Sequence, residues 1–233
     1  MSPAPPFVEA TSTWVLVPGT PILLPDVAGA SDPAAELRSV CVEELRNPLT
    51  AWTARPQGGT VGPGEVTVLA AGSVPRTWSG DAPYDVSRLL GGSRPAGPSI
   101  PLALAVGRHL VRAAGWSGPL ALQTVAGPTE PGPAGLVVAV GDGSRYRSAE
   151  GGPGAQDPRS VAFDEQVRRV LADGDVAGLR ALDVELATAL GVTGRVPWRL
   201  LADAAGGGPV EPHLGFAGDP FGPYALVATW WWR

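Results

Sequence analysis

The chain of 233 residues is long enough for one α/β domain, and 44% hydrophobic with 17% charged residues indicates a folded globule rather than a disordered chain. All 17 basic residues are arginine, and 22 acidic residues give a formal net charge of -5, so we expect neither nucleic acid nor an anionic membrane as a partner. The single cysteine, Cys41, excludes an internal disulfide and a multi-cysteine metal site. With no signal-peptide pattern and no apolar run of membrane-spanning length, we expect a cytoplasmic protein.

Apolar runs bounded by glycine and proline predict strands, and apolar stripes at helical spacing predict the helices between them. The elements expected in the first half are a strand at 13–17, a helix from Ser31 or Asp32 to Asn47–Pro48, a strand at 66–70, a helix capped by Ser99 and a strand at 120–125. Cys41 lies on an apolar stripe, which favours a core residue over a reactive thiol. The segment 76–98 is rich in turn residues and is expected to be mobile.

The second half of the sequence continues the alternation of strands and helices. Its expected elements are a strand at 137–140, a helix opened by Asp157–Pro158, a short helix after Gly174–Asp175, helical turns on either side of Asp183, a helix at 196–205 and a strand at 224–231. Alternating strands and helices predict a single α/β domain over 1–233, with a mostly parallel central sheet and helices on both faces. Residues 1–12 are expected to form a loosely ordered lead.

The loop Gly141-Asp142-Gly143-Ser144-Arg145 follows the strand at 137–140, where α/β proteins place ligand-binding groups. It lacks the third glycine of a dinucleotide fingerprint, the Gly-Lys-Ser/Thr of a P-loop and the Gly-x-Ser-x-Gly of a serine hydrolase. Arg145, with Tyr146 and Arg147, offers donors for a carboxylate or another anion. His109 is expected on a helix, partly exposed, and His213 in a proline-rich loop, and the two do not predict a metal site.

Four segments together resemble the class III extradiol ring-cleavage dioxygenases, most closely a small bacterial branch, and the resemblance covers nearly the whole chain. They are 17–25, similar to the first-strand loop, 140–144, similar to the catalytic loop, 157–164, similar to the start of the following helix, and Leu190-Gly191-Val192-Thr193-Gly194 before Trp198, similar to an Ala-Gly-x-Glu-Gly motif. The resemblance implies the α/β fold of that family. It also implies a non-haem Fe(II) ion held by two histidines and a glutamate, with a further histidine as acid/base.

None of the corresponding positions carries the residue that this chemistry requires. The first histidine matches Gly19, the second falls near Gly72–Ser73, the catalytic histidine falls near Ser144 or Arg145, and the glutamate matches Thr193. We therefore expect no cofactor and a degenerate site that binds a small anionic or aromatic molecule in the ancestral cleft. The candidate ligand-binding residues are Gly19, Ser73, Asp142, Ser144, Arg145, Thr193 and His213, with no confident catalytic residue.

Two alternatives remain open from the sequence, so whether the chain is an enzyme is undecided. One is a residual oxidoreductase, an aromatic-ring dioxygenase with a relocated metal site built from His213, Asp219 or Asp142. The other is an interaction protein without catalysis, acting as a homo-oligomer, in which Trp52, Trp78 or the terminal tryptophans cover the contact.

Overall fold

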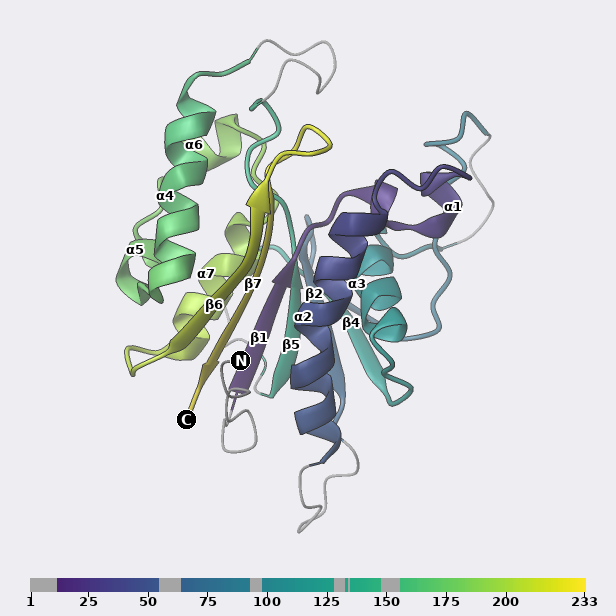
Figure 1. Cartoon of the computed structure of the whole chain (residues 1–233), viewed down its shortest axis with the longest axis horizontal. Helices are drawn as coiled ribbons and strands as arrows, with labels where there is room; N and C mark the ends of the chain where they lie inside the picture. Colours follow the sequence, from purple (N-terminus) through teal and green to yellow (C-terminus); the bar gives the residue numbers. More distant parts are fainter. Residues whose placement is uncertain (1–11, 55–63, 93–97, 128–132, 134, 148–155) are drawn as a thin grey trace.

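The computed structural model describes residues 12–54, 64–92, 98–127, 133, 135–147 and 156–233, and it shows a seven-stranded sheet between two layers of helices (Figure 1). The strand order is β3-β4-β2-β5-β1-β7-β6. The bounds are β1 Ser12–Val17, β2 Val66–Ala71, β3 Arg76–Ser79, β4 Leu120–Val125, β5 Leu136–Val140, β6 Glu211–Gly218 and β7 Ala225–Trp232. Strands β4, β2, β5 and β1 run parallel, whereas β3, β7 and β6 each pair antiparallel with their neighbours. The predicted α/β class with a mostly parallel central sheet is confirmed.

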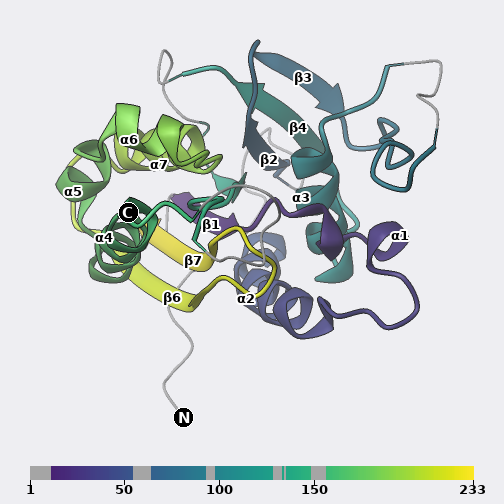
Figure 2. The same ribbon diagram turned by 90° about the horizontal axis from the view of Figure 1, so that it is seen from above.

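Helices cover both faces of the sheet (Figure 2). The first layer contains α2 Ala35–Thr53 and α3 Leu102–Ala113, preceded by the short η2 Pro21–Leu23 and α1 Pro25–Ala28. The second contains α4 Arg159–Asp173, α5 Val176–Arg180, α6 Val184–Ala189 and α7 Arg195–Ala205. None of the helices in the described ranges is long and apolar enough to cross a bilayer. The expected lead at 1–12 lies outside the described residues except for Ser12, which begins β1.

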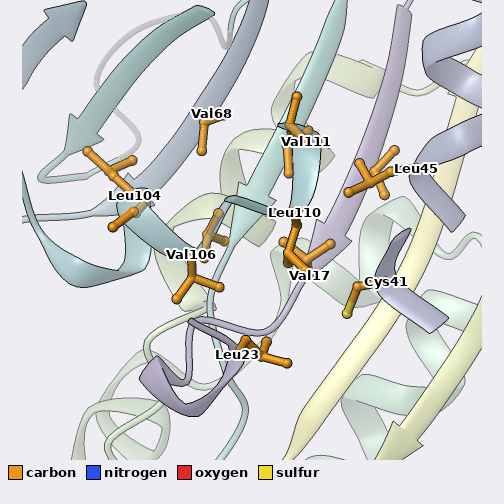
Figure 3. Close-up of a cluster of buried hydrophobic side chains, with 14 of the residues drawn as sticks. Val17, Leu23, Cys41, Leu45, Val68, Leu104, Val106, Leu110 and Val111 are labelled. Carbon is orange, nitrogen blue, oxygen red and sulfur yellow. The ribbon is translucent and has the colours of Figure 1, made fainter. Parts of the chain in front are cut away.

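The central strands are buried on both faces, which explains their continuous apolar runs. Side chains from β1, β2, α2 and α3 form one core cluster, in which Cys41 lies among aliphatic groups (Figure 3). Burial raises the pKa of the Cys41 thiol to about 12, so the residue belongs to the core as expected. A second cluster on the opposite face packs α4 and α7 against the sheet around Trp14, Trp198 and Trp230.

The predicted end of the first long helix at Pro48 is wrong, because α2 continues to Thr53 with the proline inside it. Proline removes one backbone hydrogen bond, to the carbonyl of Glu44, and usually disfavours a helix interior. Here Leu45, Pro48 and Leu49 are buried together against the core. Their burial outweighs the loss of one hydrogen bond, which the local pattern of residues does not reveal.

Two edge strands lie where the sequence predicts a turn-rich segment and a proline-rich loop. Strand β3 lies inside 76–98 and pairs with β4, and β6 carries His213, which was expected in a loop. Both have proline and glycine in or near them, the usual signals of turns. An edge strand tolerates such residues because only one of its sides donates to a neighbour. A register shift between Leu214 and Phe216 absorbs Gly215.

The start of α3 also differs from the prediction. Ser99 does not cap this helix; Pro101 stands at the cap position and the helix begins at Leu102. A proline before the first turn needs no backbone N–H donor, and its fixed φ suits a helix start. The later helices begin as expected, with the side chains of Asp175 and Asp183 accepting hydrogen bonds from the amides of Gly178 and Leu186.

Candidate functional site

Three of the candidate residues meet at the carboxyl edge of the parallel strands. The amide of Gly19, beyond β1, donates to Oδ1 of Asp142, beyond β5, over 3.1 Å. The amide of Asp142 donates to Oγ1 of Thr193 over 2.8 Å, and its carbonyl accepts from the amide of Gly194 over 2.9 Å. Asp142 therefore joins the β1 loop, the β5 loop and the segment that leads into α7.

The carboxyl group of Asp142 is largely withdrawn from water. The residue is 8% exposed, and burial raises the pKa of its carboxyl group to about 6. Hydrogen bonds from the amides of Gly19 and Thr20 and from Thr193, together with the charge of Arg145, lower this pKa without cancelling the effect of burial. Asp142 thus carries a negative charge at neutral pH and loses it in mild acid.

Glycine is required where the two site loops touch. A Cβ atom on Gly141 would lie 2.5 Å from Cα of Gly194, closer than any real contact of this kind. A Cβ on Gly143 would lie 2.8 Å from Oδ1 of Asp164. The glycines of the sequence motif therefore permit the close approach of backbone segments.

Ser144 is fully buried, and its polar groups are used inside the protein. Its amide donates to Oδ1 of Asp164 over 2.9 Å, and its hydroxyl donates to Oδ2 over 2.5 Å. Burial raises the pKa of Asp164. Sequence reasoning did not select Asp164, although an aspartate beside Phe163 and Val167 on the apolar face of a helix is a signal for an internal polar contact. Ser144 therefore shapes the loop and does not present its hydroxyl to solvent.

The two arginines of the loop differ in their surroundings. The exposed side chain of Arg145 packs its methylene groups over Gly191, and its guanidinium forms no ion pair with the residues that the structure describes. Nη1 of Arg147 lies 3.5 Å from Oδ2 of Asp164, and its Nε lies 3.6 Å from Oδ2 of Asp219. The guanidinium carbon also lies over the ring of Tyr224, 4.4 Å from the ring centroid. Arg147 is engaged within the fold, whereas Arg145 has no ion-pair partner in the part of the chain that the structure describes.

The two remaining candidates differ in position, because Ser73 follows β2, a parallel neighbour of β5, and so lies at the same carboxyl edge, whereas His213 does not. Ser73 is exposed just beyond the end of β2. His213 lies on β6 opposite Thr229, and Thr229 pairs on its other side with Val15, in the middle of the sheet. Nδ1 of His213 is 2.9 Å from Oε1 of Glu44, which also accepts a hydrogen bond from the hydroxyl of Thr229. The structure therefore does not bring His213 to the carboxyl edge.

The iron site implied by the family resemblance does not fit these residues. The position of the first histidine has only the amide of Gly19, which donates to Asp142, and the hydroxyl of Thr193 is bonded to the same residue. A ferrous site needs imidazole and carboxylate ligands with free lone pairs. Within the described ranges, no three His, Cys, Asp or Glu side chains are grouped so that they could hold a metal ion. His213, Asp219 and Asp142, which could have formed a relocated site, have separate partners.

The tryptophans considered for an oligomer contact mostly pack inside the chain. Trp230 and Trp231 are buried, and Trp52 and Trp78 are half-buried against the first core cluster.

A surface hollow beside the amino end of β4 lies at the edge opposite the predicted cleft. Its lining residues are Gly80, Asp81, Arg112, Ser117, Gly118, Pro119 and Leu120.

No model of a protein family matches the sequence, and no curated protein matches it.

Proposed function

We propose that this chain is a class III extradiol dioxygenase-like protein that lacks the iron site of that family and binds a small anionic molecule at the carboxyl edge of its sheet. The observation that carries the proposal is the exposed guanidinium of Arg145, which has no ion-pair partner in the described part of the chain. Arg145 lies beside three segments that resemble the family: the β1 loop, the β5 loop and the segment before α7. Hydrogen bonds of Asp142 join these segments.

The chemistry of the edge favours a carboxylate over a neutral aromatic molecule. A guanidinium presents a planar fork of donors that matches two carboxylate oxygens. The hydroxyl groups of Ser144 and Thr193 are already bonded inside the protein, so Arg145 supplies the main donor. The side chain of Arg145 is positioned by two contacts: its amide donates to the carbonyl of Leu190 over 3.0 Å, and its methylene groups lie over Gly191.

Calorimetric titration with acetate, benzoate and phenol tests the proposal, because the three probes separate charge from aromatic character. We expect acetate and benzoate to bind and phenol not to bind. Replacing Arg145 with alanine should weaken binding of the anions by about tenfold or more, the scale of a charge-assisted hydrogen bond.

Arg46→Ala is the matched control. Arg46 is an exposed arginine on α2, paired only with Glu43 of the same helix among the described residues, and a surface pair of this kind contributes little to stability. This variant should bind the anions as the unaltered protein does. Equal binding by the Arg145→Ala variant, or tighter binding of phenol than of benzoate, would contradict the proposal.

A further inference from the structure

The surface hollow beside the amino end of β4 has a volume of about 460 Å³. This volume lies in the usual range of small-molecule sites, about 300–1,000 Å³. Two side chains of opposite charge, Asp81 and Arg112, belong to its lining, and both are exposed. Among the residues that the structure describes, neither of them takes part in an ion pair, either with the other or with a third group. The hollow therefore presents a carboxylate and a guanidinium that do not neutralise each other.

The guanidinium of Arg112 is positioned by the loop that leads into β4. Its Nη1 donates to the carbonyls of Trp116 and Gly118, over 2.9 Å in each case. These two bonds use both protons of Nη1, and no described residue accepts a hydrogen bond from Nε or Nη2. Nη2 extends toward β3, because a Cβ atom on Gly80 would lie 3.6 Å from it. The edge formed by Nε and Nη2 thus keeps two parallel donors for a carboxylate.

The loop that holds Arg112 is fixed by the side chain of Trp116. The indole is buried, and its Nε1 donates to the carbonyl of Pro119 over 3.1 Å. Its ring also lies against Gly118, where a Cβ atom would be 2.5 Å from Cζ2. A wall that is ordered before the ligand arrives lowers the conformational entropy that binding costs.

The opposite wall of the hollow is the turn after β3, which carries Asp81. Arg108 lies one helical turn before Arg112 on α3, and its Nη1 donates to the carbonyls of Gly80 over 3.1 Å and of Ala82 over 2.6 Å. These are the two backbone neighbours of Asp81, so Arg108 fixes the chain on both sides of it. Arg108 also interacts electrostatically with Asp81 without forming an ion pair with it. Both walls are therefore attached to the same helix.

We infer that this hollow binds a small zwitterion, whose carboxylate pairs with Arg112 and whose ammonium group pairs with Asp81. A ligand that carries both charges can satisfy both side chains, whereas a simple anion or cation leaves one of them without a partner. Amino acids in the broad sense, with an ammonium group and a carboxylate on a short carbon chain, are the class of ligand that fits. The hollow lies at the amino edge of the sheet, away from Arg145, so its ligand is independent of the proposed anion site.

Titration with β-alanine, propionate and propylamine, followed by NMR of the isotope-labelled protein, tests this assignment. Near neutral pH the three probes carry both charges, only the negative charge and only the positive charge. We expect β-alanine to shift the amide resonances of Gly118 and Leu120 with a dissociation constant at least about tenfold below those of the other two probes, the scale of one charge-assisted hydrogen bond. Glycine and γ-aminobutyrate extend the series to a shorter and a longer separation of the charges.

Asp81→Asn removes the charge that distinguishes a zwitterion from an anion. This variant should bind β-alanine about tenfold more weakly and no better than propionate. Asp173→Asn is the matched control, because Asp173 is an exposed aspartate at the end of α4 and has no ion pair in the described ranges. It should keep the preference for β-alanine. Arg112→Ala should lose both ligands, but it also breaks the bonds to the loop carbonyls, so the decision lies with Asp81→Asn.

Three results would overturn the assignment. They are failure of all three amino acids to shift the amides around the hollow, equal affinity for β-alanine and propionate there, and a preference for β-alanine that survives in Asp81→Asn. Shifts confined to the amides of Gly191 and Gly194 would place the probes beside Arg145 and would also overturn it. Each of these results leaves the proposed anion site intact, and failure of benzoate and acetate to bind leaves the zwitterion site intact.

Discussion

Trp14 and Trp230 are direct neighbours across β1 and β7, and both are completely buried in the second core cluster. Their indole N–H groups have different environments. Nε1 of Trp230 donates to the carbonyl of Leu171 over 2.8 Å, whereas Nε1 of Trp14 has no acceptor among the described residues. A buried donor without an acceptor costs about 1–3 kcal/mol, so the ring of Trp14 stabilises the core through packing alone.

Replacing each tryptophan with phenylalanine separates packing from hydrogen bonding. Both changes remove the same volume from one core, but only Trp230→Phe breaks a hydrogen bond and leaves a buried carbonyl without a donor. We expect Trp230→Phe to lower the free energy of unfolding by about 1–2 kcal/mol more than Trp14→Phe does. Urea denaturation followed by circular dichroism measures both values. Equal losses, or a larger loss for Trp14→Phe, would show that the hydrogen-bond difference does not matter.

At the residue scale, the sequence predicts where polar groups lie better than it predicts what they contact. The place of Asp142 beyond a buried strand is evident from the local pattern, and the structure shows it there. Its partner Thr193 is 51 residues away in sequence, and Asp164, which binds Ser144, is 20 residues away. No local periodicity encodes such pairings, so exposed and internally bonded hydroxyl groups look alike in the sequence.

At the element scale, local patterns define the buried strands and fail at Pro48 and at the edge strands. The effect of a glycine inside a helix is also hard to predict from the local sequence pattern. Gly107 is buried in the middle of α3, and helix propensity alone favours its replacement by alanine. A Cβ atom at this position would lie 2.5 Å from Cγ1 of Val68 and 2.6 Å from Cγ2 of Val140, both on buried strands. Packing of α3 on the sheet, which the sequence does not display, decides which effect is larger.

We expect Gly107→Ala to destabilise the protein by about 1–3 kcal/mol, the usual cost of overpacking a core, instead of stabilising it by about 1 kcal/mol. Ala162→Gly, at an exposed position of α4, is the matched control for propensity. The free energy of unfolding of that variant should fall by about 1 kcal/mol, because glycine has a lower helix propensity and no core packing changes. Thermal unfolding of the two variants beside the unaltered protein tests this. A gain in stability for Gly107→Ala would mean that α3 can move away from β2 and β5 at little cost.

For the whole molecule, alternation of strands and helices predicts a parallel sheet covered on both faces, and the structure has that arrangement. The order of the strands is not predictable in the same way. Strand β5 lies between β1 and β2, and β7 joins β1 from the far end of the chain. These neighbours are selected by packing of the two core clusters, which involves residues far apart in sequence. The strand order in turn places Gly19 and Asp142 side by side.

The residues that the strand order places at the carboxyl edge of the sheet determine how the protein should respond to metal ions. A ligand that binds only the native state, present at one hundred times its dissociation constant, stabilises a protein by about 2.7 kcal/mol. For a domain of about 150–250 residues, each kcal/mol raises the melting temperature by about 2–4 °C. A ferrous site of the family type would therefore shift the melting temperature of this protein by several degrees, which calorimetry detects easily.

We expect no such shift on anaerobic addition of Fe(II), and no change after dialysis against a chelator, because the positions that the family resemblance would assign to the metal ligands are Gly19, Gly72–Ser73 and Thr193. A ferrous-iron protein treated in parallel shows that the ion remains reduced and available. Benzoate provides the opposite comparison, since the proposed anion site predicts a rise in melting temperature that is lost in Arg145→Ala. Stoichiometric iron together with a higher melting temperature would mean that ligands outside these positions form a metal site, and the degenerate-site interpretation would then be wrong.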